Sequence, residues 1–330
     1  MKFRTEYVAT RSTLTLSPDY PVVLLGSCFA ENIAGRMRSC LWDASNPLGT
    51  LYNPLSIEKA LGTLLFSSHP GMEFYESVFR AGGRFHSWLF DSRISADNRD
   101  DCMAAFLERK ESLEALLAKA QALFVTFGTS WCYYLADRKD YVVANCHKQP
   151  AAMFVRSRAG ISEIVERWEA LANRLKTRFP QLQIVFTVSP VRHLKDGFAG
   201  NSHSKAVLLL ATEELCSRLD FCHYFPAYEI VNDDLRDYRF YASDLVHPSD
   251  EGVEYIWENF RATYMDSEGE LILKEGEKIL KAWMHRPLPS ATRRVSAETA
   301  AEEERRRREI QLRHAAFKAL HPGVLPLVTL

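Results

Sequence analysis

The sequence has no long apolar run, no Cys-x-x-Cys pair and no glycine-rich loop with the spacing of a phosphate-binding motif. Without an apolar stretch of about 20 residues no membrane span is expected, and residues 1–6 lack the apolar core of a signal peptide. The seven cysteines are scattered, which favours reduced thiols in a cytoplasmic protein over a disulfide framework or a zinc site. We therefore expect neither a metal nor a bound cofactor.

The sequence also lacks an excess of either positive or negative charge. The chain has 41 Lys and Arg residues against 42 Asp and Glu residues, a formal net charge of -1. This balance provides no broad attraction to nucleic acid or to anionic lipid. At 330 residues and 47% hydrophobic content, the chain is long and apolar enough to bury a substantial core. The oligomeric state is left open.

Short buried strands alternate with amphipathic helices along most of the chain. Runs of four to six apolar residues predict strands at 22–25, 123–127, 184–188 and 221–225. Apolar residues at helical spacing separate these runs, and this alternation predicts an α/β sandwich with a parallel sheet. Residues 131–150 are expected to form an inserted hairpin, and residues 71–97 an irregular, aromatic-rich segment.

The character of the sequence changes near residue 265. We assign residues 1–265 to the α/β domain and residues 266–330 to a C-terminal extension. Residues 286–290 suggest a linker, and a charged helix is predicted over about residues 296–320. There Glu302, Glu303 and Glu304 lie four positions before Arg306, Arg307 and Arg308. Such pairing favours a solvated helix, with a partner-binding helix as the alternative.

The stretch of greatest chemical interest is residues 22–32. A buried strand ends in Gly26, Ser27 and Cys28, and a helical pattern begins at Phe29. A hydroxyl and a thiol at a strand-to-helix turn suit a nucleophile that faces an oxyanion site, because the N–H groups of a helix N-terminus favour negative charge. The alternative is structural: Ser27 caps the helix and Cys28 packs in the core.

A second pattern, near the end of the domain, could supply the acid and base that a nucleophile at this turn needs. Asp244 and His247 lie three positions apart in the loop before the last helix of the domain. This spacing allows the carboxylate to hold the imidazole while the other ring nitrogen faces a nucleophile. An exposed ion pair would give the same pattern, but the loop is expected at the sheet edge that carries the first turn.

Five sequence blocks together resemble the GSCFA family, over roughly residues 1–290, and more distantly the SGNH (GDSL-type) hydrolases. The blocks are residues 26–32, 46–54, 143–150, 188–197 and 235–249. The SGNH resemblance implies a flavodoxin-like three-layer α/β/α sandwich with a serine nucleophile after the first strand. In an ungapped alignment that serine falls on Cys28 and the aspartate before it falls on Ser27.

The same resemblance implies roles for further residues. Gly49 is the candidate for the glycine N–H of the oxyanion hole, and the third block falls on Gly128, Thr129 and Ser130. Ser130 then stands where the superfamily has an asparagine. Asp244 and His247 match the final block. Two departures stand out, a thiol as nucleophile and the missing asparagine; Ser27 is the nucleophile if the turn is rotated by one residue.

Other residues are candidates for substrate binding. His193, Lys195 and Asn201 lie in the loop after the third buried strand and could bind an acyl-carrier phosphate or a sugar hydroxyl; solvated charges are the alternative. Asn53, in the Asn-Pro loop of the second block, is a further candidate for contacting the oxyanion or the substrate. A metal at Cys146 and His147 is disfavoured because adjacent side chains point apart.

The leading hypothesis is an esterase that acts on an O-acyl ester through a covalent acyl-enzyme. Cys28 or Ser27 attacks, His247 moves the proton and Asp244 orients it. A thiolate beside an imidazolium and a helix N-terminus is expected to have a depressed pKa. One rival is an O-acetyltransferase acting on a glycan or glycan precursor, which would take acyl-CoA or another acyl donor. A rival of another class is a carbohydrate- or ligand-binding module without turnover.

Overall fold

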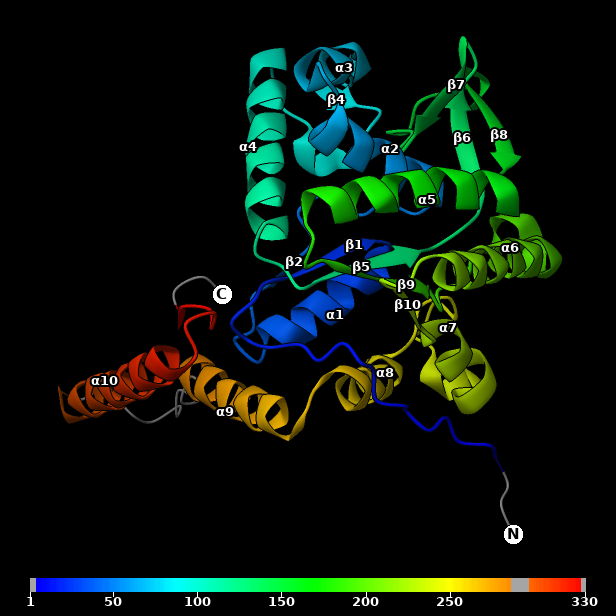
Figure 1. The fold of residues 1–330 in the computed structure, drawn as a ribbon. Helices are drawn as coiled ribbons and strands as arrows, with labels where there is room; N and C mark the ends of the chain where they lie inside the picture. Colours follow the sequence, from blue (N-terminus) through cyan, green and yellow to red (C-terminus); the bar gives the residue numbers. More distant parts are fainter. Residues whose placement is uncertain (1–3, 286–296, 328–330) are drawn as a thin grey trace.

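Residues 4–285 and 297–327 are described by the computed structural model (Figure 1). A five-stranded sheet lies at its centre, with every strand parallel to its neighbours. Its strands are β1 (Val22–Gly26), β2 (Ala44–Ser45), β5 (Ala122–Phe127), β9 (Gln183–Val188) and β10 (Cys222–Phe225). The spatial order is β10-β9-β5-β1-β2. This is the flavodoxin-like order, so the predicted α/β sandwich is confirmed.

Helices cover both faces of the sheet (Figure 1). On one face lie α1 (Cys28–Arg38) and α8 (Asp250–Tyr264). On the other lie α2 (Pro54–Phe66), α4 (Arg99–Leu117), α5 (Ile161–Arg178) and α6 (Gly197–Arg218). All five residues of β1 are buried, as expected for a strand covered on both faces. Each face has its own apolar core.

The sheet has a topological switch point between β1 and β5, which are neighbours in register. The chain leaves β1 into α1 on one face, whereas α5, which leads into β9, lies on the opposite face. Connections that diverge in this way leave a crevice at the carboxyl ends of the two strands. The residues after β1 and β5 therefore meet at a place suited to a ligand.

A three-stranded antiparallel sheet follows β5, formed by β6 (Trp131–Leu135), β7 (Arg138–Val143) and β8 (Phe154–Arg158). The predicted hairpin is present, but its turn lies at Ala136 and Asp137, and the charged residues after it belong to β7. Strand β8 was not predicted. Its side chains alternate between exposed and half-buried, which gives an apolar pattern too weak to identify a strand.

The aromatic segment is more regular than the sequence suggested. It contains α3 (Pro70–Ser77) and a hairpin of β3 (Val78–Ala81) and β4 (Arg84–Ser87). Gly82 and Gly83 form its two-residue turn, both with positive φ, at 55° and 82°. Two such residues match a type I′ turn, whose twist suits a hairpin. The expectation of irregular structure was wrong here.

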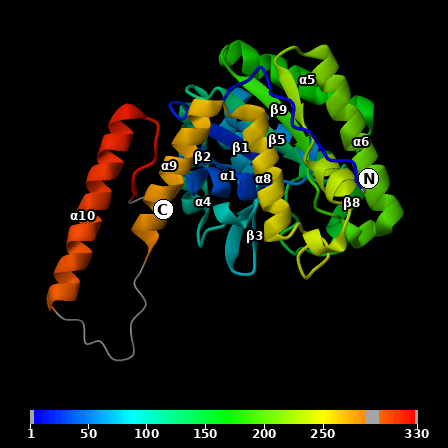
Figure 2. The same ribbon diagram turned by 90° about the horizontal axis from the view of Figure 1, so that it is seen from below.

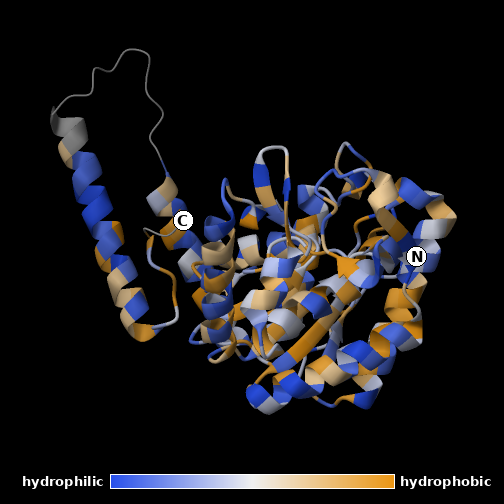
Figure 3. Ribbon diagram, turned by 90° about the horizontal axis from the view of Figure 1, so that it is seen from above, coloured by the Kyte–Doolittle hydropathy of each residue, from blue (hydrophilic) through white to orange (hydrophobic). Residues whose placement is uncertain are grey.

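The short helix α7 (Ala227–Glu229) follows β10. The C-terminal part of the chain is helical, with α9 (Ser267–Met284) and α10 (Ala297–Leu320). Helix α10 stands apart from the sheet in Figures 1 and 2 and packs against α9 through Ile310 and Phe317. Its middle is mainly hydrophilic (Figure 3), and Glu303–Arg307 and Glu304–Arg308 pair as predicted. The predicted linker at 286–290 lies outside the described residues. None of the described helices is long and apolar enough to span a membrane.

Candidate active site

The turn after β1 presents Cys28 as the first residue of α1. Ser27 is the N-cap: it is 1% exposed, and its Oγ accepts a hydrogen bond from the N–H of Phe29 at 3.4 Å. Cys28 is only half-buried. Ser27 therefore has the capping role that its residue type favours, and the thiol is the more accessible of the two candidate nucleophiles.

Burial raises the pKa of the Cys28 thiol above its ordinary value of 9.0. The N–H groups of Phe29 and Cys28, and the charge of Lys205, oppose this effect without cancelling it. The sequence-based expectation of a depressed pKa was wrong, because it counted the helix N-terminus and a neighbouring imidazolium but not the loss of water. The resting side chain is therefore a thiol, and its reaction needs a base.

His247 has the arrangement of such a base. Its Nδ1 lies 2.7 Å from Oδ2 of Asp244, whose Oδ1 accepts the N–H groups of His247 and Val246 at 3.0 and 2.9 Å. Hydrogen bonds from these two N–H groups and from the ring lower the pKa of Asp244 to about 2. An ionised carboxylate can only accept, so Nδ1 carries the proton and Nε2 of the neutral ring is free to take one.

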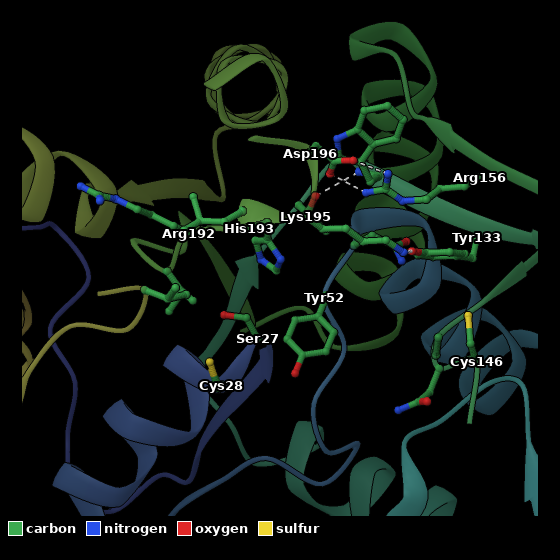
Figure 4. Close-up of a pocket in the computed structure, with 18 of the residues that line it drawn as sticks. Ser27, Cys28, Tyr52, Tyr133, Cys146, Arg156, Arg192, His193, Lys195 and Asp196 are labelled. Carbon is green, nitrogen blue, oxygen red and sulfur yellow. Dashed lines mark hydrogen bonds and ion pairs between the residues drawn. The ribbon is translucent and has the colours of Figure 1, made fainter. Parts of the chain in front are cut away.

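Cys28 and His247 line the same cleft at the carboxyl edge of the sheet, with a volume of about 470 Å³. Residues from the ends of β1, β5 and β9 and from the loop before α8 contribute to it. Figure 4 shows Ser27 and Cys28 on its floor, with Tyr52 and His193 beside them. The cleft therefore brings together the two patterns that lie at opposite ends of the domain sequence.

The inserted sheet forms one wall of the cleft. Trp131, Tyr133 and Arg156 come from β6 and β8, and the Arg156 guanidinium lies 4.2 Å from the centre of the Trp131 ring. Arg156 also forms a bidentate ion pair with Asp196 across the cleft (Figure 4). Lys195 donates to the Tyr133 hydroxyl at 2.6 Å. The insertion thus presents aromatic rings and positive charge to whatever occupies the cleft.

The loop after β9 forms the opposite wall through residues 191–196. His193 and Lys195 line the cleft as expected, but Asn201 does not: its Oδ1 accepts the His193 N–H at 2.9 Å and so fixes the loop. Burial and the charge of Lys205 lower the pKa of His193 to about 4. The His193 ring is therefore neutral near pH 7, and its edge packs against Tyr52.

Asn53 also lines the cleft while capping α2. Its Oδ1 accepts from the N–H of Ser56 at 2.8 Å and from the Cys132 thiol at 3.4 Å, which fixes the orientation of the amide. Among the described residues no acceptor pairs with its Nδ2 group. A carboxamide donor is therefore present at the cleft, although not at the position where the SGNH pattern places one.

Three residues that the resemblance suggested for the oxyanion site do not line the cleft: Ser130, Gly49 and Gly128. Ser130 is fully buried, lies outside the cleft lining and hydrogen-bonds to Ser204. Gly49 has a φ of +75°, its N–H is directed to the Asn46 carbonyl, and an added Cβ would meet Oδ2 of Asp91 at 2.4 Å. Gly49 therefore serves the turn rather than an oxyanion.

Gly128 borders the site without lining it. Its N–H is bonded to the carbonyl of Tyr52 at 2.8 Å. A Cβ at Gly128 would approach Ser27, His193 and the Tyr52 backbone within 3.0 to 3.4 Å. The position therefore keeps space between the Ser27–Cys28 turn and the β9 loop rather than providing a donor.

Several cleft residues were missed by sequence reasoning: Tyr52, Trp131, Tyr133 and Arg156. The buried Lys205, which donates to the Gly128 carbonyl, was missed as well. Lys205 had a usable signal, because it shares a helical face with Leu208 and Leu215, and a lone charge on an apolar face is unusual. Among the described residues, no group of three or more His, Cys, Asp or Glu side chains is arranged to hold a metal ion.

A model of the GSCFA family matches residues 21–260, well over half of the sequence. The chain belongs to the GSCFA family. No curated protein matches it in sequence. In structure this GSCFA protein is similar to a Parabacteroides merdae protein described as a GDSL-like lipase, with 14% identity, a TM-score of 0.35 and coverage of 79% of this chain and 100% of that one. A carbohydrate esterase of family 3 from Talaromyces cellulolyticus has 7% identity, a TM-score of 0.30 and coverage of 78% and 99%.

Proposed function

We propose that this protein is an SGNH-like esterase that cleaves O-acyl esters through an acyl-enzyme on Cys28. The observation that carries the proposal is the shared cleft: a half-buried thiol at a helix N-terminus and an imidazole whose Nδ1 is held by a carboxylate. A nucleophile, a base and an orienting acid are the three parts that acyl transfer requires.

The proposed reaction has two halves. Sγ of Cys28 attacks the ester carbonyl carbon while its proton moves to Nε2 of His247, and the C=O electron pair moves onto oxygen. Collapse of this intermediate breaks the C–O bond, and the leaving alkoxide takes the proton from His247. Water then repeats the sequence on the thioester, releasing the acid and restoring the thiol.

Two donors suit the oxyanion. The N–H of Cys28 is in the first turn of α1, where N–H groups have no intrahelical partner, and the Asn53 Nδ2 group lies in the same cleft. In this proposal Asn53 takes the part of the missing third-block asparagine.

The charge in the cleft narrows the substrate class. Three cationic side chains line the cleft: Arg156, Arg192 and Lys195. The single carboxylate among the lining residues belongs to Asp196, and it is already paired with Arg156. The guanidinium of Arg192 lies 4.3 Å from the centre of the Tyr241 ring. This excess of positive charge favours an ester whose acyl or alcohol part bears a negative charge.

The aromatic wall supports a second candidate, transfer of the acyl group to a sugar hydroxyl. Tyr52, Trp131 and Tyr133 line the cleft beside the cations. Aromatic faces pack against sugar rings, and a thioester intermediate is suited to passing its acyl group to a hydroxyl. A glycan acceptor in place of water would make the same site a transferase.

The test is intact-protein mass spectrometry after incubation with an activated acetyl ester. Cys28→Ala should abolish the acyl adduct, and Cys28→Ser should retain a weak one, because a hydroxyl ionises poorly at neutral pH. Cys146→Ala is the matched control, since Cys146 is another half-buried cysteine of the cleft. Ser27→Ala should keep the adduct and lower stability by about 1 kcal/mol through the lost cap. An adduct that disappears in Ser27→Ala but survives in Cys28→Ala would move the nucleophile to Ser27. No adduct in any variant would favour a binding module.

A further inference from the structure

One ion pair joins the inserted sheet to the loop after β9. Arg156 of β8 donates through Nη1 and Nη2 to the two carboxylate oxygens of Asp196, the second bond at 2.6 Å. Both side chains line the cleft, with 24% and 14% of their surface exposed. Figure 4 shows the pair on the side of the cleft away from Cys28. A ligand group at Arg156 would therefore be remote from the atom that the thiol attacks.

The Arg156 guanidinium is held by contacts other than Asp196. It lies 4.2 Å from the centre of the Trp131 ring and 5.4 Å from the centre of the Tyr133 ring. The nearby Lys195 ammonium bonds to the Tyr133 hydroxyl and adds a second positive charge. A guanidinium fixed in this way matches the planar, two-oxygen edge of a carboxylate or a phosphate. Two cations of this wall thus share one protein carboxylate.

Asp196 lies next to a second place for its carboxylate. It is the residue before α6, where an aspartate side chain usually accepts from the N–H groups of the first helical turn. Its side chain makes no such bond, because both oxygens are given to Arg156. Asp196 nevertheless lies against this turn: a Cβ on Gly200 would be 2.5 Å from the Asp196 Cβ. Gly197, with a φ of +69°, permits the backbone rotation that would turn the carboxylate towards the helix.

We propose that Arg156 binds a carboxylate or phosphate group of the ligand, and that Asp196 occupies this site until the ligand displaces it to the first turn of α6. The proposal rests on the proposed function, for which it names the residue that takes the charged part of the ester. Both carboxylates keep a partner after the exchange, since the helix N-terminus favours negative charge. A neutral ligand cannot replace the lost ion pair, so the exchange selects anionic ligands.

The first experiment compares the binding of benzoate and benzamide by isothermal titration calorimetry, because the two probes share a shape and differ in charge. Asp196→Asn removes the competing charge and keeps the size of the side chain. Benzoate should bind about fivefold more tightly or better, because more of Arg156 is available to it, and benzamide should be unaffected. Phenyl phosphate is measured in the same way. Tightening of either anion supports the proposal, and the larger response identifies the preferred anion.

Two control variants separate the ion pair from general charge effects. Asp140→Asn removes an exposed negative charge from β7 of the same inserted sheet and should change neither affinity. Arg156→Gln should remove most of the preference for benzoate over benzamide, whereas Arg158→Gln, at an exposed position of the same strand, should keep it. Unchanged or weaker benzoate binding in folded Asp196→Asn would overturn the proposal, because the pair would then be a strut of the cleft wall.

The second experiment follows the exchange in the wild-type protein, by NMR of the ¹⁵N-labelled backbone. Benzoate should move the N–H signals of Phe198 and Ala199, in the first turn of α6, to lower field as they gain an acceptor. Benzamide should not, and neither should benzoate added to Asp196→Ala. Benzoate binding to the wild type without these shifts would refute the exchange. None of the probes is a carboxylic ester, so a protein that forms no acyl adduct on Cys28 still gives a clear answer on Arg156.

Discussion

The Nδ1 atom of His247 lies 2.7 Å from Oδ2 of Asp244, and the other oxygen of that carboxylate accepts the His247 backbone N–H at 3.0 Å. One carboxylate thus holds both the ring and the main chain of the same residue. Leu245 between them has a φ of +57°, an unusual conformation for a leucine, and the Ala242 N–H closes the loop onto the His247 carbonyl at 2.8 Å. The loop is built to fix one orientation of the imidazole.

Asp244→Asn tests that relationship. The amide can present an N–H to Nδ1 and so favour the wrong tautomer, leaving Nε2 protonated and unable to act as a base. We expect formation of the Cys28 acyl adduct to slow by a factor on the order of 100 or more. Asp237→Asn is a suitable control, because Asp237 is an exposed acid that makes the same kind of local bond, to the Arg239 N–H. Equal rates for wild type and Asp244→Asn would show that the imidazole is not the base.

The pH dependence should follow the thiol rather than the carboxylate. Asp244 has a folded pKa below its ordinary 3.8, so its contribution to stability is complete above that value and is lost as the pH falls through about 2. The pKa of Cys28 is raised from 9.0. The rate of Cys28 alkylation should therefore still rise as the pH passes about 9. A plateau below about pH 8 would mean that the thiol is more acidic than its burial allows.

Asn53→Ser separates oxyanion binding from helix capping. Serine is as good an N-cap as asparagine, so α2 should keep its start while the Nδ2 donor is lost. Adduct formation should fall by about 100-fold or more, as for removal of one oxyanion donor. The same substitution at Asn98, the N-cap of α4, measures the cost of the exchange at a remote site. If both variants react like the wild type, Asn53 is only a cap.

Lys195→Gln tests the charge preference. Its ammonium lines the cleft and bonds to a tyrosine hydroxyl rather than to a carboxylate. For an ester that carries a carboxylate or phosphate, KM should rise several-fold, and the difference should shrink as salt screens the interaction. An uncharged ester should show little change. Lys139→Gln, at an exposed position of β7, serves as the control. Equal effects on charged and neutral esters would argue against an anionic substrate.

Truncation near residue 290 tests the role of the C-terminal helix. None of the described residues of α9 or α10 lines the cleft, so ester cleavage should stay within a few-fold of the full chain. Stability should fall, because Ile310 and Phe317 cover Leu41 and Ile279, and the removed residue Leu325 donates its N–H to the Leu41 carbonyl. Thermal unfolding measures the second effect. Complete loss of activity in a folded truncation would show that the extension completes the site.

Much of the fold followed from local patterns. Buried runs at 22–25, 123–127 and 184–188 became β1, β5 and β9, because a strand covered on both faces must be apolar throughout. Four strands escaped prediction. β3, β4 and β8 lie in small antiparallel sheets with exposed faces, where the pattern weakens, and β2 has only two residues, too few to show a pattern. The candidate roles of Cys28 and of the Asp244–His247 pair could be proposed from the sequence for a similar reason: each proposal depends on a spacing of a few residues.

Only the tertiary structure decided the environment of those residues. The resemblance to SGNH hydrolases put Ser130 where an asparagine donor is expected, but Ser130 is buried against Ser204 outside the cleft lining, and Asn53 from a distant loop lies in the cleft instead. The sequence predicted an acidic thiol at Cys28, but burial by segments far apart in the chain raises the thiol pKa. Lys205 is 177 positions from Cys28 in the sequence, yet in the folded chain its charge acts on the Cys28 thiol. Spacing is a local property of the chain, whereas the exclusion of water and the fields of buried charges exist only once distant segments have packed together.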